Sequence, residues 1–190
     1  MLHGRTAPLS SHSAATAPVV SATTLRATQR TLGSTIRTDP PRVRVPVGAL
    51  GDWFAAETDL GPYRVVVLIS TTSLLPIVEP AREIDDLATR LPGIVGRRLR
   101  RLGVSERAVE AETAAMGAVG VDGTNDRSTV GVLMHLVGEL PRYLPEESWD
   151  LTTLPWIERM VAETPRFRSS RIHETVQPCE AARLLVERRW

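Results

Sequence analysis

The sequence contains no lysine and only one cysteine among its 190 residues. The absence of lysine excludes the phosphate-binding loop G-x-x-x-x-G-K-[ST], whose lysine contacts the nucleotide phosphates. The single cysteine, Cys179, excludes an internal disulfide and a cysteine-based metal cluster. All 23 basic residues are therefore arginines. GC-rich codon usage explains this bias more simply than function does.

Charge and long apolar runs are also scarce. The formal net charge is +1, which gives no strong attraction to nucleic acid or to an anionic membrane. The longest apolar runs, such as Val65–Ile69, are far too short to span a bilayer. The hydrophobic content of 42% is typical of a globular protein, so we expect a cytoplasmic protein without a membrane segment.

The residues most often used in catalysis and metal binding are few and scattered. His3, His12, His135 and His173 show no metal-ligand spacing, so we expect neither a metal nor a cofactor. The G-x-S-x-G motif of hydrolases is absent. Cys179 lies near a predicted helix start, but it lacks a close partner in the sequence, and we expect no nucleophile there.

Three segments differ in composition. Residues 1–23 are rich in Ser, Ala, Thr and Pro and lack the apolar stretch of a signal peptide, which predicts a disordered leader. Residues 24–145 predict an α+β domain. Residues 146–190 predict a helical C-terminal extension.

Apolar periodicity predicts the elements of this domain. Continuous β-branched residues predict a buried strand at Tyr63–Ser70, and helical spacing predicts a helix over 81–103 that Pro92 kinks or restarts. Ser105 is expected to cap the next helix. The further predicted strands are Leu25–Thr28, Leu50–Glu57, Leu74–Val78 and Ala118–Val121, and the further predicted helices are Gln29–Ile36, Ser105–Met116, Leu154–Glu163 and Pro178–Arg189.

The stretch GTNDRSTVGVLMHL, residues 123–136, joins a polar cluster to an apolar stripe. The stripe falls on one helical face, so Thr124, Asn125 or Asp126 is expected to cap a helix. Alternatively, Asp126 would act as a base, Arg127 as an anion clamp and His135 as a proton carrier. Asp126 and His135 are nine positions apart, about 13–14 Å along a helix, which favours capping.

Four blocks of sequence resemble a bacterial family known as a domain of unknown function. Its pattern has L-x-A-T-x-x-L-L, L-G-D-W-Y-A-N, an apolar strand pair and T-x-N-R-S-V-x-G-S-M-N-D. The corresponding blocks are LRATQRTL, LGDWFAA, VVVLISTTSLLPIVEPA and TNDRSTVGVLMHL. The resemblance covers residues 24–144 and implies an α+β fold without implying an activity. The family's Ser-Met-Asn-Asp is replaced here by residues 132–135, Val-Leu-Met-His.

These patterns together predict an α+β fold. We expect a small antiparallel or mixed sheet with helices packed mainly on one face, followed by the C-terminal helical extension. Trp149 and Trp156 flank the start of that extension. They are expected to dock it onto the domain, although they would also suit a partner surface.

Residues 97–117 also resemble a helix-turn-helix. The four arginines that would contact phosphates are Arg97, Arg98, Arg100 and Arg101. The second helix, however, carries one arginine against three glutamates, a net charge of −2 that disfavours entry into a DNA groove. We therefore expect sequence-specific binding of nucleic acid to be absent.

The sequence assembles no nucleophile, base and orienting group, so we expect a non-catalytic interaction or regulatory module. Its partner would be another protein or a second copy of the chain. Two alternatives stay open: an enzyme acting on nucleic acid or a nucleotide, with Asp126 and Arg127 at a cleft, or a DNA-binding protein that uses Arg97–Arg101.

Overall fold

A computed structural model describes residues 23–28, 48–82, 84–124, 126–146, 148–167 and 175–190. The predicted leader up to residue 22 and the predicted helix at 29–36 lie outside these residues. In the part of the chain that the structure describes, no helix combines the length and the apolar character needed to cross a bilayer.

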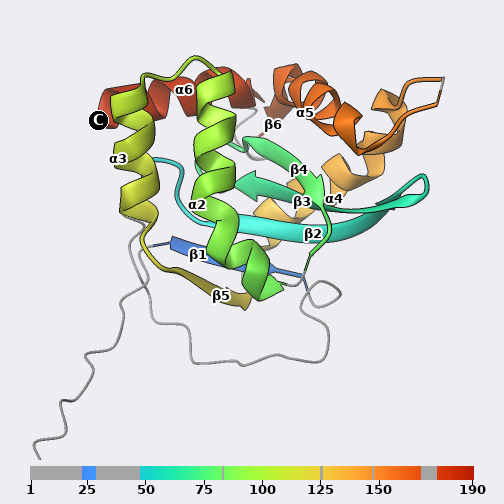
Figure 1. Ribbon diagram of the computed structural model, residues 1–190, viewed down its shortest axis with the longest axis horizontal. Helices are drawn as coiled ribbons and strands as arrows, with labels where there is room; N and C mark the ends of the chain where they lie inside the picture. Colours follow the sequence, from blue (N-terminus) through green and yellow to red (C-terminus); the bar gives the residue numbers. More distant parts are fainter. Residues whose placement is uncertain (1–22, 29–47, 83, 125, 147, 168–174) are drawn as a thin grey trace, which may run out of the picture.

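A five-stranded mixed sheet forms the centre of the molecule (Figure 1). The strand order is β4-β3-β2-β1-β5. Strands β2, β3 and β4 pair antiparallel, whereas β1 pairs parallel with both β2 and β5. This arrangement confirms the predicted α+β fold. The bounds are β1 Thr23–Ala27, β2 Trp53–Leu60, β3 Tyr63–Ser70, β4 Pro76–Pro80 and β5 Val119–Gly123, and a separate hairpin, not predicted from sequence, joins β6 Arg166–Phe167 to β7 Thr175–Val176.

Helices surround this sheet. Helices α2 and α3 lie side by side across one face, joined by a short turn at Gly103 (Figure 1). Helix α2 continues through Pro92. Ser105 is at the N-cap position of α3, but its hydroxyl donates to Glu187 instead of capping the helix. The bounds are α2 Ile84–Arg101, α3 Glu106–Met116, α4 Arg127–Glu139, α5 Leu154–Glu163 and α6 Pro178–Arg189, with short 3-10 turns η1 Leu140–Tyr143 and η2 Leu151–Thr153.

The sheet has an apolar core on each face. The first core packs Leu25, Trp53 and Leu68 against α2, α3 and α6. The second packs Phe54 and Val67 against α4 and α5. Three helices therefore cover one face and two cover the other, because strands that are apolar on both sides must be covered on both sides.

The two C-terminal helices contribute to these cores. Ile157 and Val161 of α5 lie in the second core, and Ala182 and Val186 of α6 lie in the first. Trp149 packs against Tyr63 with ring centroids 5.0 Å apart, and so docks the segment before α5 onto the β2–β3 hairpin. The division of the chain at residue 145 stays a prediction.

The outer edge of β4 is covered. Prolines, which have no N–H to offer a further strand, stand at both ends, Pro76 and Pro80. The N–H of Val78 donates to Glu158 Oε2 of α5 at 3.2 Å. Glu158 in turn forms an ion pair with Arg98 of α2, Nε to Oε1 at 2.9 Å. This buried pair joins helices from opposite faces of the sheet around its β4 edge.

A second buried carboxylate holds the loop before β2. Glu112 of α3 accepts the N–H groups of Ala49 and Leu50 at 2.7 and 2.9 Å, and the indole N–H of Trp190 at 2.8 Å. A Cβ at Gly48 would lie 2.8 Å from Glu112 Oε1, so a larger residue there would displace the carboxylate. Glu112 therefore connects α3, the loop before β2 and the end of α6.

Candidate interaction site at the β5–α4 junction

An ion-pair network joins β1, β5 and the residue just before β2. Arg26 of β1 lies opposite Asp122 of β5, and its Nη1 donates to Asp122 Oδ2 at 3.1 Å. Its Nε donates to Asp52 Oδ2, just before β2, at 3.2 Å. All three side chains are largely buried but still reach solvent, with exposures between 14 and 25%.

The remaining carboxylate oxygens of this network also have donors. Asp52 Oδ1 accepts the N–H of Thr24 at 3.0 Å, and Asp122 Oδ1 accepts the N–H of Gly123 at 2.7 Å. The network therefore stabilises the parallel pairing of β1 with its two neighbours. Sequence reasoning missed it because Arg26 and Asp122 are 96 positions apart and carry no local signal.

The polar cluster after β5 begins a helix. Asp126 is the N-cap of α4, and its carboxylate accepts the Ser128 N–H at 2.9 Å and the Thr129 hydroxyl. The hydrogen bond from Thr129 holds the pKa of Asp126 below its usual range, although partial burial opposes this shift. The capping prediction is confirmed for Asp126, and Asn125 lies outside the described residues.

Replacing Asp126 by alanine is expected to lower the free energy of unfolding by about 0.5–2 kcal/mol, as for other lost N-caps. Because the folded-state pKa is depressed, this stabilisation should be present above the unfolded pKa and disappear as the pH falls through the folded one. Urea unfolding of both chains at pH 7 and at successively lower pH measures the difference. A stability difference that does not shrink as the pH falls would contradict the assignment.

Arg127 and His135 lie apart from this cap. Arg127 is exposed, and no hydrogen bond or ion pair of its side chain is found within the described residues. His135, two turns further along α4, has a side chain 70% exposed, and its Nε2 lies 3.3 Å from Glu139 Oε1. Glu139 also accepts from Arg166 at 2.9 Å. The structure therefore does not bring Asp126 and His135 together.

The outer face of α4 is open to solvent. Met134 is 50% exposed, and a Cβ added at Gly131 or Gly138 would meet no atom within 4 Å. Met134 and His135 therefore both belong to an exposed surface of α4.

The four arginines at the end of α2 lie close to carboxylates. Arg97 Nη2 is 3.3 Å from Glu79, and Arg100 Nε donates to Glu106 at 2.9 Å. Arg98 is buried against Glu158, while Arg101 Nη1 is 3.9 Å from the same carboxylate. These contacts reduce the positive charge available to a phosphate backbone.

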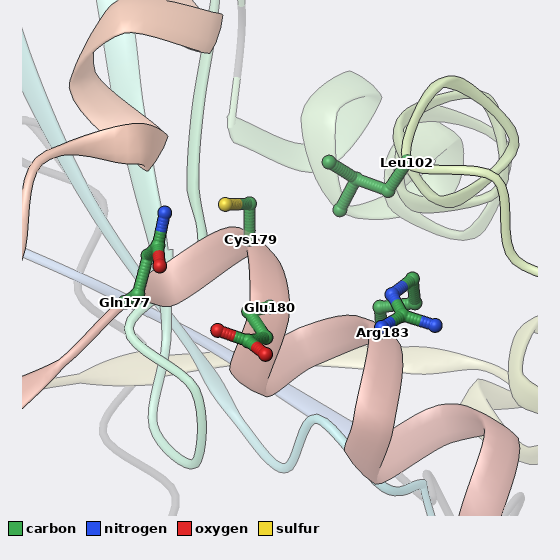
Figure 2. Close-up of a pocket in the computed structure, with 5 residues that line it drawn as sticks. All are labelled: Leu102, Gln177, Cys179, Glu180 and Arg183. Carbon is green, nitrogen blue, oxygen red and sulfur yellow. The ribbon is translucent and has the colours of Figure 1, made fainter.

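A shallow hollow of about 290 Å³ lies beside the start of α6 (Figure 2). It is lined by Leu102, Gln177, Cys179, Glu180 and Arg183. His173, the histidine nearest to Cys179 in sequence, lies outside the described residues. Within the described part of the chain, no group of three or more His, Cys, Asp or Glu residues could hold a metal ion. A lone thiol in an open hollow does not assemble a catalytic group.

Comparison with known proteins assigns the chain to a family. No curated protein and no solved structure matches it. The model of one family, the domain of unknown function DUF6933, matches residues 24–181. The match begins within β1, includes the Arg26–Asp52–Asp122 network and α4, and ends in α6. The chain therefore belongs to the DUF6933 family.

Proposed function

We propose that this protein is a non-catalytic interaction module that binds a partner protein at the β5–α4 junction. The observation that carries the proposal is the contrast between Asp126 and Arg127. Asp126 accepts two hydrogen bonds within its own helix start, so it is poorly placed to take a proton from a substrate. Arg127, its neighbour, is exposed and unpaired within the described residues.

The position of Arg127 supports a role outside the helix. A cation in the first turn opposes the helix dipole, so Arg127 does not stabilise the start of α4. Arginine is enriched in protein interfaces, where its planar guanidinium makes several hydrogen bonds. An exposed arginine that gives its own helix no benefit is well suited to contact a partner.

Replacing Arg127 by alanine is expected to change the free energy of unfolding by less than about 0.5 kcal/mol, as for most surface substitutions. With the Arg127→Ala chain as bait, recovery of the cellular partner should be about tenfold or more lower than with the unsubstituted chain. Quantitative co-purification and urea unfolding, with Arg107→Ala as an exposed arginine control on α3, measure both effects.

The alternative functions give different results in the same experiment. Turnover of a nucleotide or nucleic acid that Asp126→Ala and Arg127→Ala both abolish, without loss of stability, would contradict a non-catalytic module. Sequence-specific DNA binding at physiological salt, lost when Arg97, Arg100 and Arg101 are replaced, would contradict it as well.

A further inference from the structure

The two edges of the sheet differ in whether their outward backbone groups are blocked. The β4 edge ends in prolines and gives its Val78 N–H to Glu158. The β5 edge, Val119–Gly123, contains no proline, and among the strands that the structure describes it pairs with β1 alone. Exposed edge strands present unpaired backbone groups to other chains, and proteins usually block them. Only the β4 edge carries such a block among the described residues.

The hydrogen-bond pattern of β1 shows which backbone groups of β5 point away from the sheet. The N–H groups of Thr24 and Thr28 donate toward the β2 side, to Asp52 and Ala55. Because N–H directions alternate along a strand, Leu25 faces β5 instead. Leu25 is in register with Val121. In a parallel pair, the backbone groups of a residue bond to the two residues that flank its register partner, so those of Leu25 face Gly120 and Asp122.

Val119, Val121 and Gly123 therefore direct their backbone groups away from the sheet. The Gly123 N–H already donates to Asp122 Oδ1. For Val119 and Val121, no hydrogen bond from the outer backbone groups is found in the described part of the chain. These groups can pair with an added strand without breaking a hydrogen bond to any other described residue.

The side chains of β5 indicate which strand would fit. Val119 and Val121 are half-buried against the first core, so residues beside them gain apolar contacts. On the opposite face, Asp122 belongs to a network of one arginine and two aspartates, with a net charge of −1. This negative charge favours a basic residue of the added strand opposite Asp122. Arg127 lies beyond the end of β5, so a basic residue of the added strand is disfavoured beyond Gly123.

We infer that β5 binds an extended segment of a partner protein as a sixth strand of the sheet, with apolar and basic residues alternating along that segment. This inference rests on the proposed function and names the kind of partner. Main-chain hydrogen bonds supply affinity in this mode of recognition, and alternate side chains supply specificity.

The test uses two labelled, end-capped hexapeptides, one alternating valine with arginine and one alternating valine with glutamate. Fluorescence anisotropy with the full chain should show that the arginine peptide binds at least about tenfold more tightly. Val121→Pro removes an outward N–H and should weaken this binding by about tenfold or more. Val121→Thr keeps the N–H and the branched shape, and should bind within about threefold of the original chain.

A measurement on the unsubstituted chain keeps the test valid if Val121→Pro unfolds. The arginine peptide should slow amide hydrogen exchange at Val119 and Val121 by about tenfold or more, and leave Val78 unchanged. Equal binding of both peptides, or unchanged exchange at β5, would overturn the inference. Self-association of the chain that Val121→Pro abolishes, without peptide binding, would overturn it in favour of a second copy.

The outcome separates this inference from the proposed function. Loss of the cellular partner in Arg127→Ala, together with full retention in Val121→Pro, would overturn the added strand alone. Retention of the partner in Arg127→Ala, together with its loss in Val121→Pro, would support the added strand and contradict the role of Arg127.

Discussion

Replacing Arg98 by methionine is expected to lower the free energy of unfolding by about 3–5 kcal/mol, the usual effect of leaving one member of a buried ion pair without its partner. Arg98 and Glu158 are 3% and 2% exposed, so water cannot replace the guanidinium. Glu158 would keep only the Val78 N–H and the more distant Arg101, 3.9 Å away. Urea unfolding followed by circular dichroism measures the change.

The pH dependence of the Arg98 variant identifies the cause. Burial raises the pKa of Glu158, and the charge of Arg98 opposes this rise. Without Arg98 the folded-state pKa should rise further above its unfolded value. The variant should therefore regain stability as the pH falls through that folded value, because the folded state then binds the proton more strongly than the unfolded state.

A double variant is the matched control. Combining Arg98→Met with Glu158→Gln removes both charges and leaves an amide oxygen that can accept from Val78. Most of the lost stability should return, since the buried charge without a counter-ion is what destabilises the single variant. A single variant that loses less than about 1 kcal/mol, or a double variant less stable than the single one, would contradict this assignment.

Replacing Glu112 by alanine should have the second large effect, a loss of about 2–6 kcal/mol. Two buried N–H groups, of Ala49 and Leu50, lose their acceptor, at about 1–3 kcal/mol each. The indole N–H of Trp190 loses its acceptor as well. Guanidinium chloride unfolding, followed by circular dichroism, measures the loss.

Trp190→Phe separates the hydrogen bonds of Glu112 to the loop before β2 from its hydrogen bond to Trp190. It removes the indole donor and keeps Ala49 and Leu50 bonded to Glu112, so its loss should be well below that of Glu112→Ala. Equal losses in the two variants would show that Glu112 acts mainly through the end of α6, contrary to our expectation.

Local patterns in the sequence predict most elements of the fold. The structure reproduces the bounds expected for β3, α5 and α6, because each has an uninterrupted apolar period. The pairing of β1 with β2 and β5 could not be predicted in the same way. Parallel neighbours are set by packing between distant segments, and nothing near Thr23–Ala27 specifies them.

Two of the buried charged groups, Arg98 and Glu112, had a signal that sequence reasoning did not use. Arg98 stands three residues after Val95 and seven after Leu91, on the apolar stripe of α2. Glu112 stands three after Val109 and four before Met116, on the buried face of α3. A charged residue within an apolar stripe indicates a buried partner. Glu158 carries the same signal on α5, four residues after Leu154 and three before Val161. The signal does not identify which residue, 60 or more positions away, is the partner.

The candidate site could be predicted only in part. The cap at Asp126 follows from local spacing, and the structure confirms it. The network of Arg26, Asp52 and Asp122 depends on strand order, and the difference between the two sheet edges depends on a carboxylate from α5. Both features arise from tertiary packing, which a single sequence does not specify locally.

The place of β1 in the sheet has a consequence for how the chain folds. Strand β1 is made first, but it lies between β2 and a strand that follows it by more than 90 residues. The antiparallel hairpins of β2, β3 and β4 can form early, because their loops are short. The β1–β5 ladder must close a loop of more than 90 residues, so we expect this pairing to be a late, slow step. During synthesis, the β5 side of β1 stays unpaired until β5 is made, and an unpaired strand edge promotes aggregation.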